Sequence, residues 1–170
     1  SHCVPANPIL KIGATVDREE DGVPSVDADG DGYSLYFNRD ELKTRQRALP
    51  PEIKQSTAAS GRTGVTYLSP TDIDAGGTWL AVNEFGMTIC ILNNYMAPEP
   101  KGIDFQSRGD IVAELAVSKS IANAEQLLSK MDLHRFRGFD LVLFDEQVVQ
   151  WCWDTESFQR KIPSMSLTSS

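Results

Sequence analysis

The chain has 170 residues, 41% hydrophobic and 24% charged, which supports one globular domain over residues 1–170 and excludes a disordered or collagen-like protein. Sixteen basic and 24 acidic residues give a formal charge of -8, which argues against nucleic acid or an anionic membrane as the main partner. No apolar run reaches the roughly 20 residues of a membrane span, and the three cysteines, Cys3, Cys90 and Cys152, lack zinc-type spacing. We therefore expect a soluble cytoplasmic protein without a metal or other cofactor.

The N-terminal part of the chain alternates short strand patterns with acidic segments. Residues 9–12 and 33–37 are predicted strands, and residues 13–32 between them are predicted to be an acidic loop insertion. Within this insertion, residues 27–32 have the alternating carboxylates and the glycine of a calcium loop. However, Asn38 stands where that pattern requires a bidentate glutamate, so we interpret the segment as a solvated turn.

The central part of the chain is predicted to be an antiparallel sheet. Pro50 and Pro51 open a segment that we expect to be a mobile loop over residues 50–64. β-Branched and aromatic residues then predict strands at 65–68, 78–82 and 87–92, and Gly86 suits the left-handed position of a hairpin turn between the last two.

Two helices and a hairpin are predicted in the C-terminal part. One helix is expected to start at Ser107, with Asp110 completing a capping box, and a second covers residues 121–131. Residues 139–144 and 147–153 then predict a hairpin with apolar side chains on both faces, which is typical of a sheet covered on both sides. This order predicts an α+β layered sandwich.

Four polar residues, Asn38, Arg39, Asp40 and Glu41, follow the predicted strand at 33–37 without an intervening turn signal. Polar side chains at the end of a strand are held by a rigid sheet, which is typical of a binding or catalytic site. The alternative is an ion pair of Arg39 with Asp40 that only stabilises the strand end. The residues alone leave both interpretations open.

Four further motifs follow this segment in a fixed order, at residues 72–79, 82–86, 92–95 and 107–109. Together they resemble the NRDE family, the proteins similar to transport and Golgi organisation protein 2, over roughly residues 33–170. The resemblance implies an N-terminal-nucleophile (Ntn) hydrolase-like fold, a four-layer αββα sandwich of mostly antiparallel sheets. It also implies that the chain is truncated at its C-terminal end.

The resemblance also implies catalytic residues. In Ntn hydrolases the first residue is the nucleophile and its free amine is the base, and the nearest candidate here is Cys3. Ser1 and His2 would have to be removed to free that amine. By the same resemblance, Arg39 and Asp40 position the nucleophile and substrate, and Asn93 helps to form the oxyanion hole.

Five further residues are candidates for substrate binding: Asn38, Asn83, Asn94, Gly76 and Gly77. The three asparagines offer amide donors, and the glycine pair allows a ligand or another chain segment to approach the backbone closely. The alternatives to substrate binding are that an asparagine only stabilises a turn and that the glycine pair only forms a tight turn.

Two functions remain open. The first is an Ntn-type amidohydrolase that cleaves the C–N bond of a small non-peptide amide. The second is a non-catalytic protein of the same fold that binds or carries a small molecule such as haem or a lipid. In both cases we expect a small-molecule partner, no nucleic acid and no stable membrane insertion.

Overall fold

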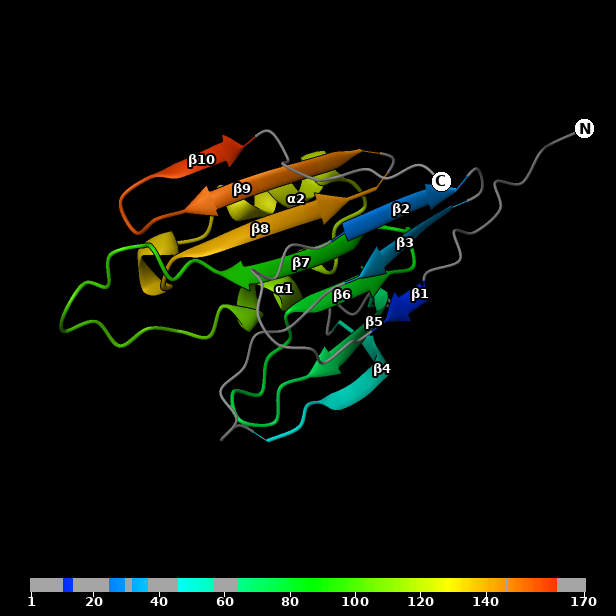
Figure 1. Cartoon of the computed structure of the whole chain (residues 1–170), viewed down its shortest axis with the longest axis horizontal. Helices are drawn as coiled ribbons and strands as arrows, with labels where there is room; N and C mark the ends of the chain where they lie inside the picture. The colour runs from blue at the N-terminus through cyan, green and yellow to red at the C-terminus, as the bar shows by residue number, and fades with distance from the viewer. Residues whose placement is uncertain are drawn as a thin grey trace, which may run out of the picture. The chain divides into compact units, whose positions relative to one another are not determined.

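The computed structural model of the protein describes residues 11–13, 25–29, 32–36, 46–56, 64–145 and 147–161, and in the first three ranges it describes the backbone alone. The chain divides into two compact units, residues 1–45 with 164–170 and residues 46–163. Each unit contains one sheet (Figure 1).

The first unit contains a three-stranded sheet in the order β1-β3-β2. β1 (Lys11–Gly13) and β3 (Gly32–Tyr36) are parallel, and β2 (Ser25–Asp29) is antiparallel to β3, with Asp29 paired to Gly32. β3 matches the strand predicted at 33–37. β2, in contrast, lies inside the segment predicted as an acidic loop, because its polar and small apolar residues alternate with the period of a strand.

The second unit contains a seven-stranded antiparallel sheet in the order β10-β9-β8-β7-β6-β5-β4. The strands are β4 (Leu49–Gln55), β5 (Thr66–Thr71), β6 (Leu80–Asn83), β7 (Thr88–Asn93), β8 (Phe139–Phe144), β9 (Val148–Trp153) and β10 (Phe158–Lys161). The predicted antiparallel sheet and the hairpin at 139–153 are thus confirmed. The predicted left-handed conformation of Gly86 is confirmed as well, since its φ is 81°. Residues 49–55 form β4 instead of the predicted loop, with a register shift at Pro50 and Pro51.

The helices are α1 (Gly109–Leu115), α2 (Ile121–Leu128) and the short 3₁₀ helix η1 (Leu133–Arg135). The predicted capping box at Ser107 was wrong. The N-cap of α1 is Arg108 without a side-chain cap, and the Ser107 hydroxyl accepts a hydrogen bond from the Gly109 N–H instead. α2 begins with a true side-chain cap, because Ser120 accepts a hydrogen bond from the N–H of Asn123.

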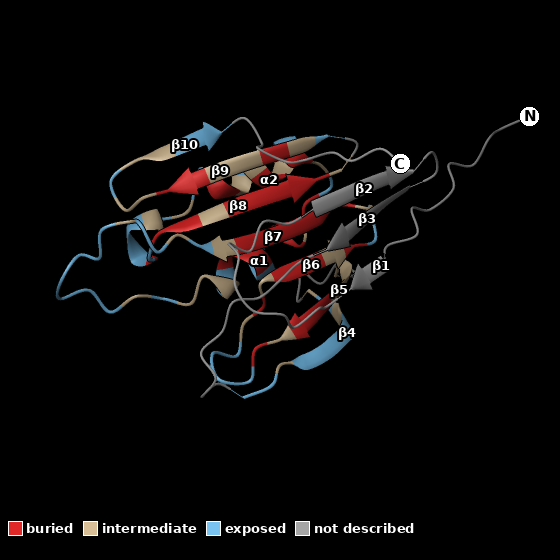
Figure 2. Ribbon diagram, viewed as in Figure 1, coloured by how far each residue is buried: buried red, intermediate tan, exposed pale blue. Residues whose placement is uncertain are grey.

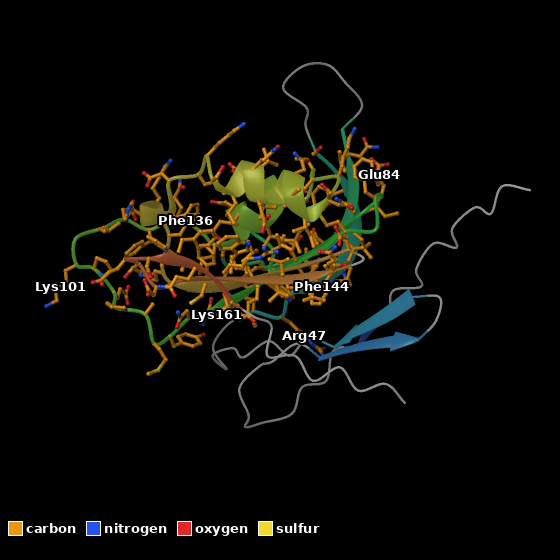
Figure 3. The ribbon with its side chains drawn as sticks, turned by 90° about the horizontal axis from the view of Figure 1, so that it is seen from above. Arg47, Glu84, Lys101, Phe136, Phe144 and Lys161 are labelled. Carbon is orange, nitrogen blue, oxygen red and sulfur yellow. The ribbon has the colours of Figure 1, made fainter. Side chains whose placement is uncertain are left out.

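α1 and α2 cover one face of the seven-stranded sheet, and the main core lies between this helix layer and the sheet (Figures 2 and 3). Along β7 the side chains of Ile89 and Ile91 point to this core, where they meet Ile111 and Leu115 of α1. The intervening Cys90 belongs to the other face and is fully buried, and its neighbours Leu80 and Val142 are buried as well. Both faces of the central strands are therefore removed from solvent, as their apolar composition predicted.

α1 approaches the sheet unusually closely at its first turn. A Cβ added to Gly109 would lie 2.7 Å from the Thr78 backbone nitrogen and 2.9 Å from the Gly77 Cα. These distances are shorter than real Cβ contacts allow, and both obstacles are backbone atoms that cannot rotate away. The glycine therefore permits the contact between α1 and the segment before β6.

We predict that Gly109→Ala lowers the free energy of unfolding by about 1–3 kcal/mol, because the added methyl overpacks this contact, although alanine is the better helix former. Ala113→Gly, at an exposed position of the same helix, is the matched control for helix propensity and should cost about 1 kcal/mol. Urea unfolding followed by circular dichroism measures both. A stabilised Gly109→Ala variant would contradict the tight packing.

Candidate functional site

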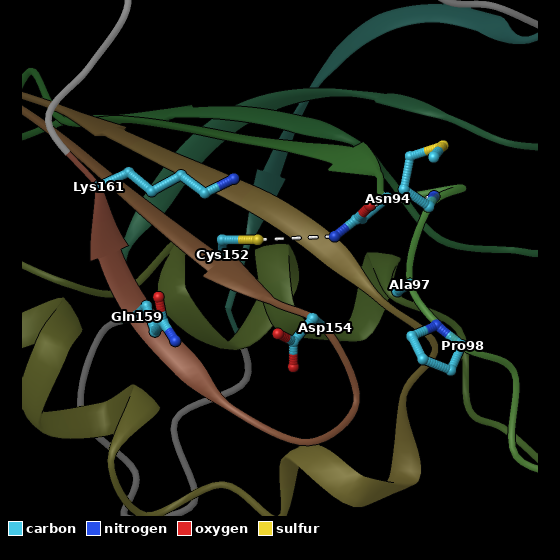
Figure 4. Close-up of a pocket in the computed structure, with 8 residues that line it drawn as sticks. Asn94, Ala97, Pro98, Cys152, Asp154, Gln159 and Lys161 are labelled. Carbon is cyan, nitrogen blue, oxygen red and sulfur yellow. Dashed lines mark hydrogen bonds between the residues drawn. The ribbon is translucent and has the colours of Figure 1, made fainter.

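Two adjacent asparagines at the end of β7 point in different directions. Asn93 pairs with Phe139, a core residue of the helix-covered face, and its exposed side chain donates a hydrogen bond of 2.8 Å to the Tyr95 hydroxyl. Asn94 lies beside Cys152, and its Nδ2 is 3.5 Å from the Cys152 Sγ (Figure 4). Of these two asparagines, Asn94 and not Asn93 contributes its amide to the pocket described next.

This pocket has a volume of about 460 Å³. Its polar lining comes from the end of β7, from β9 and from β10, and its apolar lining comes from the loop after β7. The lining residues are Asn94, Met96, Ala97, Pro98, Cys152, Asp154, Gln159 and Lys161 (Figure 4). Cys152 pairs with Gln159, and both lie on the sheet face opposite to the helices. The pocket thus combines amide, thiol and charged groups with an apolar rim.

A charged network surrounds the Cys152 thiol. Lys161 Nζ is 3.4 Å from Asp140 Oδ1, and Gln150 donates to the same oxygen at 3.4 Å. Burial raises the pKa of Cys152, a hydrogen bond from Lys161 opposes this, and the negative charge of Asp140 adds to the increase. Cys152 is therefore a neutral thiol at physiological pH and not an activated nucleophile.

The surroundings of Cys90 oppose its ionisation even more strongly than those of Cys152. Its side chain is fully buried in β7, and this burial raises its pKa far above the ordinary value of a thiol. Neither of the two described cysteines has the properties of a catalytic thiolate.

Asn83 has a structural role. Its Nδ2 donates to the carbonyl oxygens of Ala116 and Ser118 at 3.0 and 2.6 Å, and its Oδ1 accepts from the N–H groups of Phe85 and Met87. The buried side chain thereby ties the β6–β7 turn to the end of α1. Since its donors and its acceptor are occupied by backbone groups, Asn83 has no free hydrogen-bonding capacity for a substrate.

Gly76 forms a tight turn and Gly77 allows close approach of another chain segment, the two structural roles that the sequence left open. Gly76 has a φ of 69° in a turn where its N–H donates to the Asp72 carbonyl at 2.7 Å. Gly77 is the residue approached by Gly109 at the start of α1. A turn and another chain segment therefore account for this glycine pair without a ligand.

The remaining predicted site residues, Cys3, Asn38, Arg39 and Asp40, lie outside the described residues, so their roles stay predictions. The described part of the chain contains no group of three His, Cys, Asp or Glu side chains that could hold a metal ion. Nor does any helix in that part have the length and apolarity needed to cross a membrane.

Sequence reasoning missed Cys152, Asp154, Gln159 and Lys161. The alternation of β9 could have separated Cys152 from its neighbours Trp151 and Trp153, which belong to the helix-covered face. β10 has no comparable signal, because its four residues include only one apolar side chain. Its position beside β9 depends on the tertiary structure.

The fold and pocket define a protein of the α+β class with a helix-covered antiparallel sheet and a polar pocket at the end of β7. The family model described as Transport and Golgi organisation 2 matches residues 29–166, and the chain belongs to this family. The resemblance to the NRDE proteins is thereby confirmed. No curated protein matches the chain.

We predict that Asn83→Ala lowers the free energy of unfolding by about 2–4 kcal/mol, because buried backbone groups lose their partners. Asn93→Ala is the matched control at an exposed position and should change this free energy by less than about 0.5 kcal/mol. Urea unfolding measures both variants. Equal effects of the two substitutions would contradict the structural role of Asn83.

We also predict that Lys161→Met moves the pKa of Cys152 further upward, because the variant loses the cation and hydrogen bond that favour the thiolate, while Asp140 remains. The midpoint of the pH profile of Cys152 alkylation, followed by peptide mapping, gives this pKa. Arg160→Met is the matched control, since Arg160 lies 4.0 Å from Glu125 on the other face. A midpoint that moves downward in Lys161→Met would refute the interaction.

Proposed function

We propose that this protein is an Ntn-type amidohydrolase that cleaves a small non-peptide amide with Cys3 as its nucleophile. The observation that carries the proposal is a pocket with an inward-pointing amide, that of Asn94, in a member of this family. The Cys90 and Cys152 thiols are both held neutral by burial, so a cysteine mechanism needs a different sulfur. Cys3 is the one other cysteine of the chain.

The proposed reaction begins with attack of the Cys3 thiolate on the amide carbonyl, after the free α-amine has taken the thiol proton. The carbonyl π electrons move to oxygen, and the resulting oxyanion accepts a hydrogen bond from an amide N–H, a role that we transfer from Asn93 to Asn94. Breaking of the C–N bond releases the amine with the transferred proton. Water then hydrolyses the thioester and regenerates Cys3.

We further propose for this chain the four-layer αββα sandwich that the family resemblance implies, together with a cytoplasmic location. The sheet face away from the helices supports the sandwich, because buried apolar side chains such as Leu80, Val142 and Phe144 require a covering layer. Arg39 and Asp40 keep the roles that the family resemblance implies, positioning the thiol and the substrate.

The alternative proposal is a protein that binds or carries a small apolar molecule without catalysis. Its supporting observation is the loop after β7, where Ala97 and Pro98 line the pocket and Met96 is 93% exposed beside them. Met96 lines the pocket together with Ala97 and Pro98, and such an apolar lining suits an apolar ligand. A small molecule is the partner under both proposals.

Under the hydrolase proposal, Cys3 should alkylate faster than Cys90 or Cys152 once it is the first residue, because its own ammonium and Arg39 both favour the thiolate. Intact-mass analysis with and without iodoacetamide reports the true N-terminus and the number of reactive thiols. Peptide mapping then identifies the labelled cysteine.

Arg39→Ala should slow the labelling of Cys3, whereas Arg47→Ala, which removes an exposed arginine, should leave it unchanged. Labelling of Cys3 at the rate of Cys152 or more slowly would leave the hydrolase proposal without a nucleophile. The binding protein would then be the better account.

A further inference from the structure

β4 is the terminal strand of the seven-stranded sheet, and its residues are largely exposed (Figure 2). Ile53, at its centre, is 77% exposed, although isoleucine is among the residues most often buried in proteins. An exposed edge strand with an apolar side chain is a template for pairing with another strand. β4 therefore has the properties of an interaction surface.

The backbone of β4 presents alternate residues to the outside. Glu52 and Lys54 pair with Ser69 and Tyr67 of β5, and the N–H of Ser56 donates to the Val65 carbonyl at 2.9 Å. Because hydrogen-bonded positions alternate along an antiparallel strand, the N–H and C=O groups of Ile53 point away from β5. The same alternation directs the backbone groups of Gln55 outward.

We propose that β4 pairs with β4 of a second copy of this chain, antiparallel and with Ile53 on the two-fold axis. In this register the two Ile53 residues exchange two backbone hydrogen bonds, and each Gln55 N–H donates to the Pro51 carbonyl of the second copy. A continuous sheet then runs through both protomers. The interface is isologous, as in most homodimers.

The charges of β4 select this register. Glu52 and Lys54 flank Ile53 on both sides, so the two-fold axis places each Glu52 opposite Lys54 of the second copy, which gives two oppositely charged cross-strand pairs. A shift by two residues toward either side would place Glu52 opposite Glu52 or Lys54 opposite Lys54. Lys54 Nζ already donates to Thr71 Oγ1 at 2.7 Å, and an ammonium has two further protons for a carboxylate.

The two prolines of β4 are compatible with this pairing. Pro50 and Pro51 lack an N–H, and proline and lysine at an edge strand often serve to prevent pairing. In the proposed register, however, Pro51 contributes only its carbonyl oxygen as an acceptor. Pro50 lies at the register shift of β4, beyond the residues that pair.

Sedimentation velocity of the whole chain over a range of concentrations tests the proposal. The unmodified protein should sediment as a dimer, and Lys54→Glu should weaken the dimer by roughly tenfold, since it places two carboxylates opposite each other in both pairs. The exchanged pair Glu52→Lys with Lys54→Glu should restore the dimer. Lys130→Glu, with the same change of charge at an exposed helix-end position, should leave it unchanged.

Disulfide trapping in a Cys3→Ser background tests the register independently. Ile53→Cys should oxidise to a covalent dimer, since directly paired Cα atoms about 5.5 Å apart suit a disulfide. Lys54→Cys should not, because in this register Lys54 faces Glu52 and not itself. A monomer at all concentrations, a dimer indifferent to Lys54→Glu, or trapping through Lys54→Cys alone would each overturn the proposal.

Discussion

The alternation of side chains along the central antiparallel strands governs both the fold and the pocket. In β7, Ile89 and Ile91 point toward the helices, while Cys90 points toward the other face, and all three are buried. A strand of this kind is stable only when both of its faces are covered, which demands layers on each side. The same alternation continues past the strand end and separates Asn93 from Asn94.

α1 is fixed against the sheet at both of its ends by polar or backbone contacts, in addition to the apolar core. At one end, Gly109 allows the start of α1 to lie against Gly77 and Thr78. At the other, Asn83 binds the carbonyl groups of Ala116 and Ser118 at the end of α1. Apolar packing is nondirectional, so directional contacts of this kind, together with the hydrogen bond from Arg108 Nη1 to the Gly138 carbonyl, position α1 along the sheet.

The chemistry of the pocket follows from its place on the sheet. Asn94 and Cys152 come from different hairpins, and the antiparallel register brings them within 3.5 Å. The burial that shields this pair also raises the pKa of the Cys152 thiol, so the pocket has polar side chains but no activated thiolate of its own. The neutral state of both described cysteines is the reason for proposing Cys3 as the nucleophile.

The sequence alone determined the family, the α+β class, the central strands and the turn at Gly86, because local periodicity and glycine preferences are encoded residue by residue. Its motif order placed candidate residues near strand ends but could not tell which faces they use. Asn83 and Asn93 therefore became site candidates. In the structure, the Asn83 side chain makes all of its hydrogen bonds to backbone groups, and the Asn93 side chain points away from the pocket. Only tertiary structure decided this, since the two carbonyl groups that accept from Asn83 lie more than 30 residues away and β10 gains its position by pairing with β9.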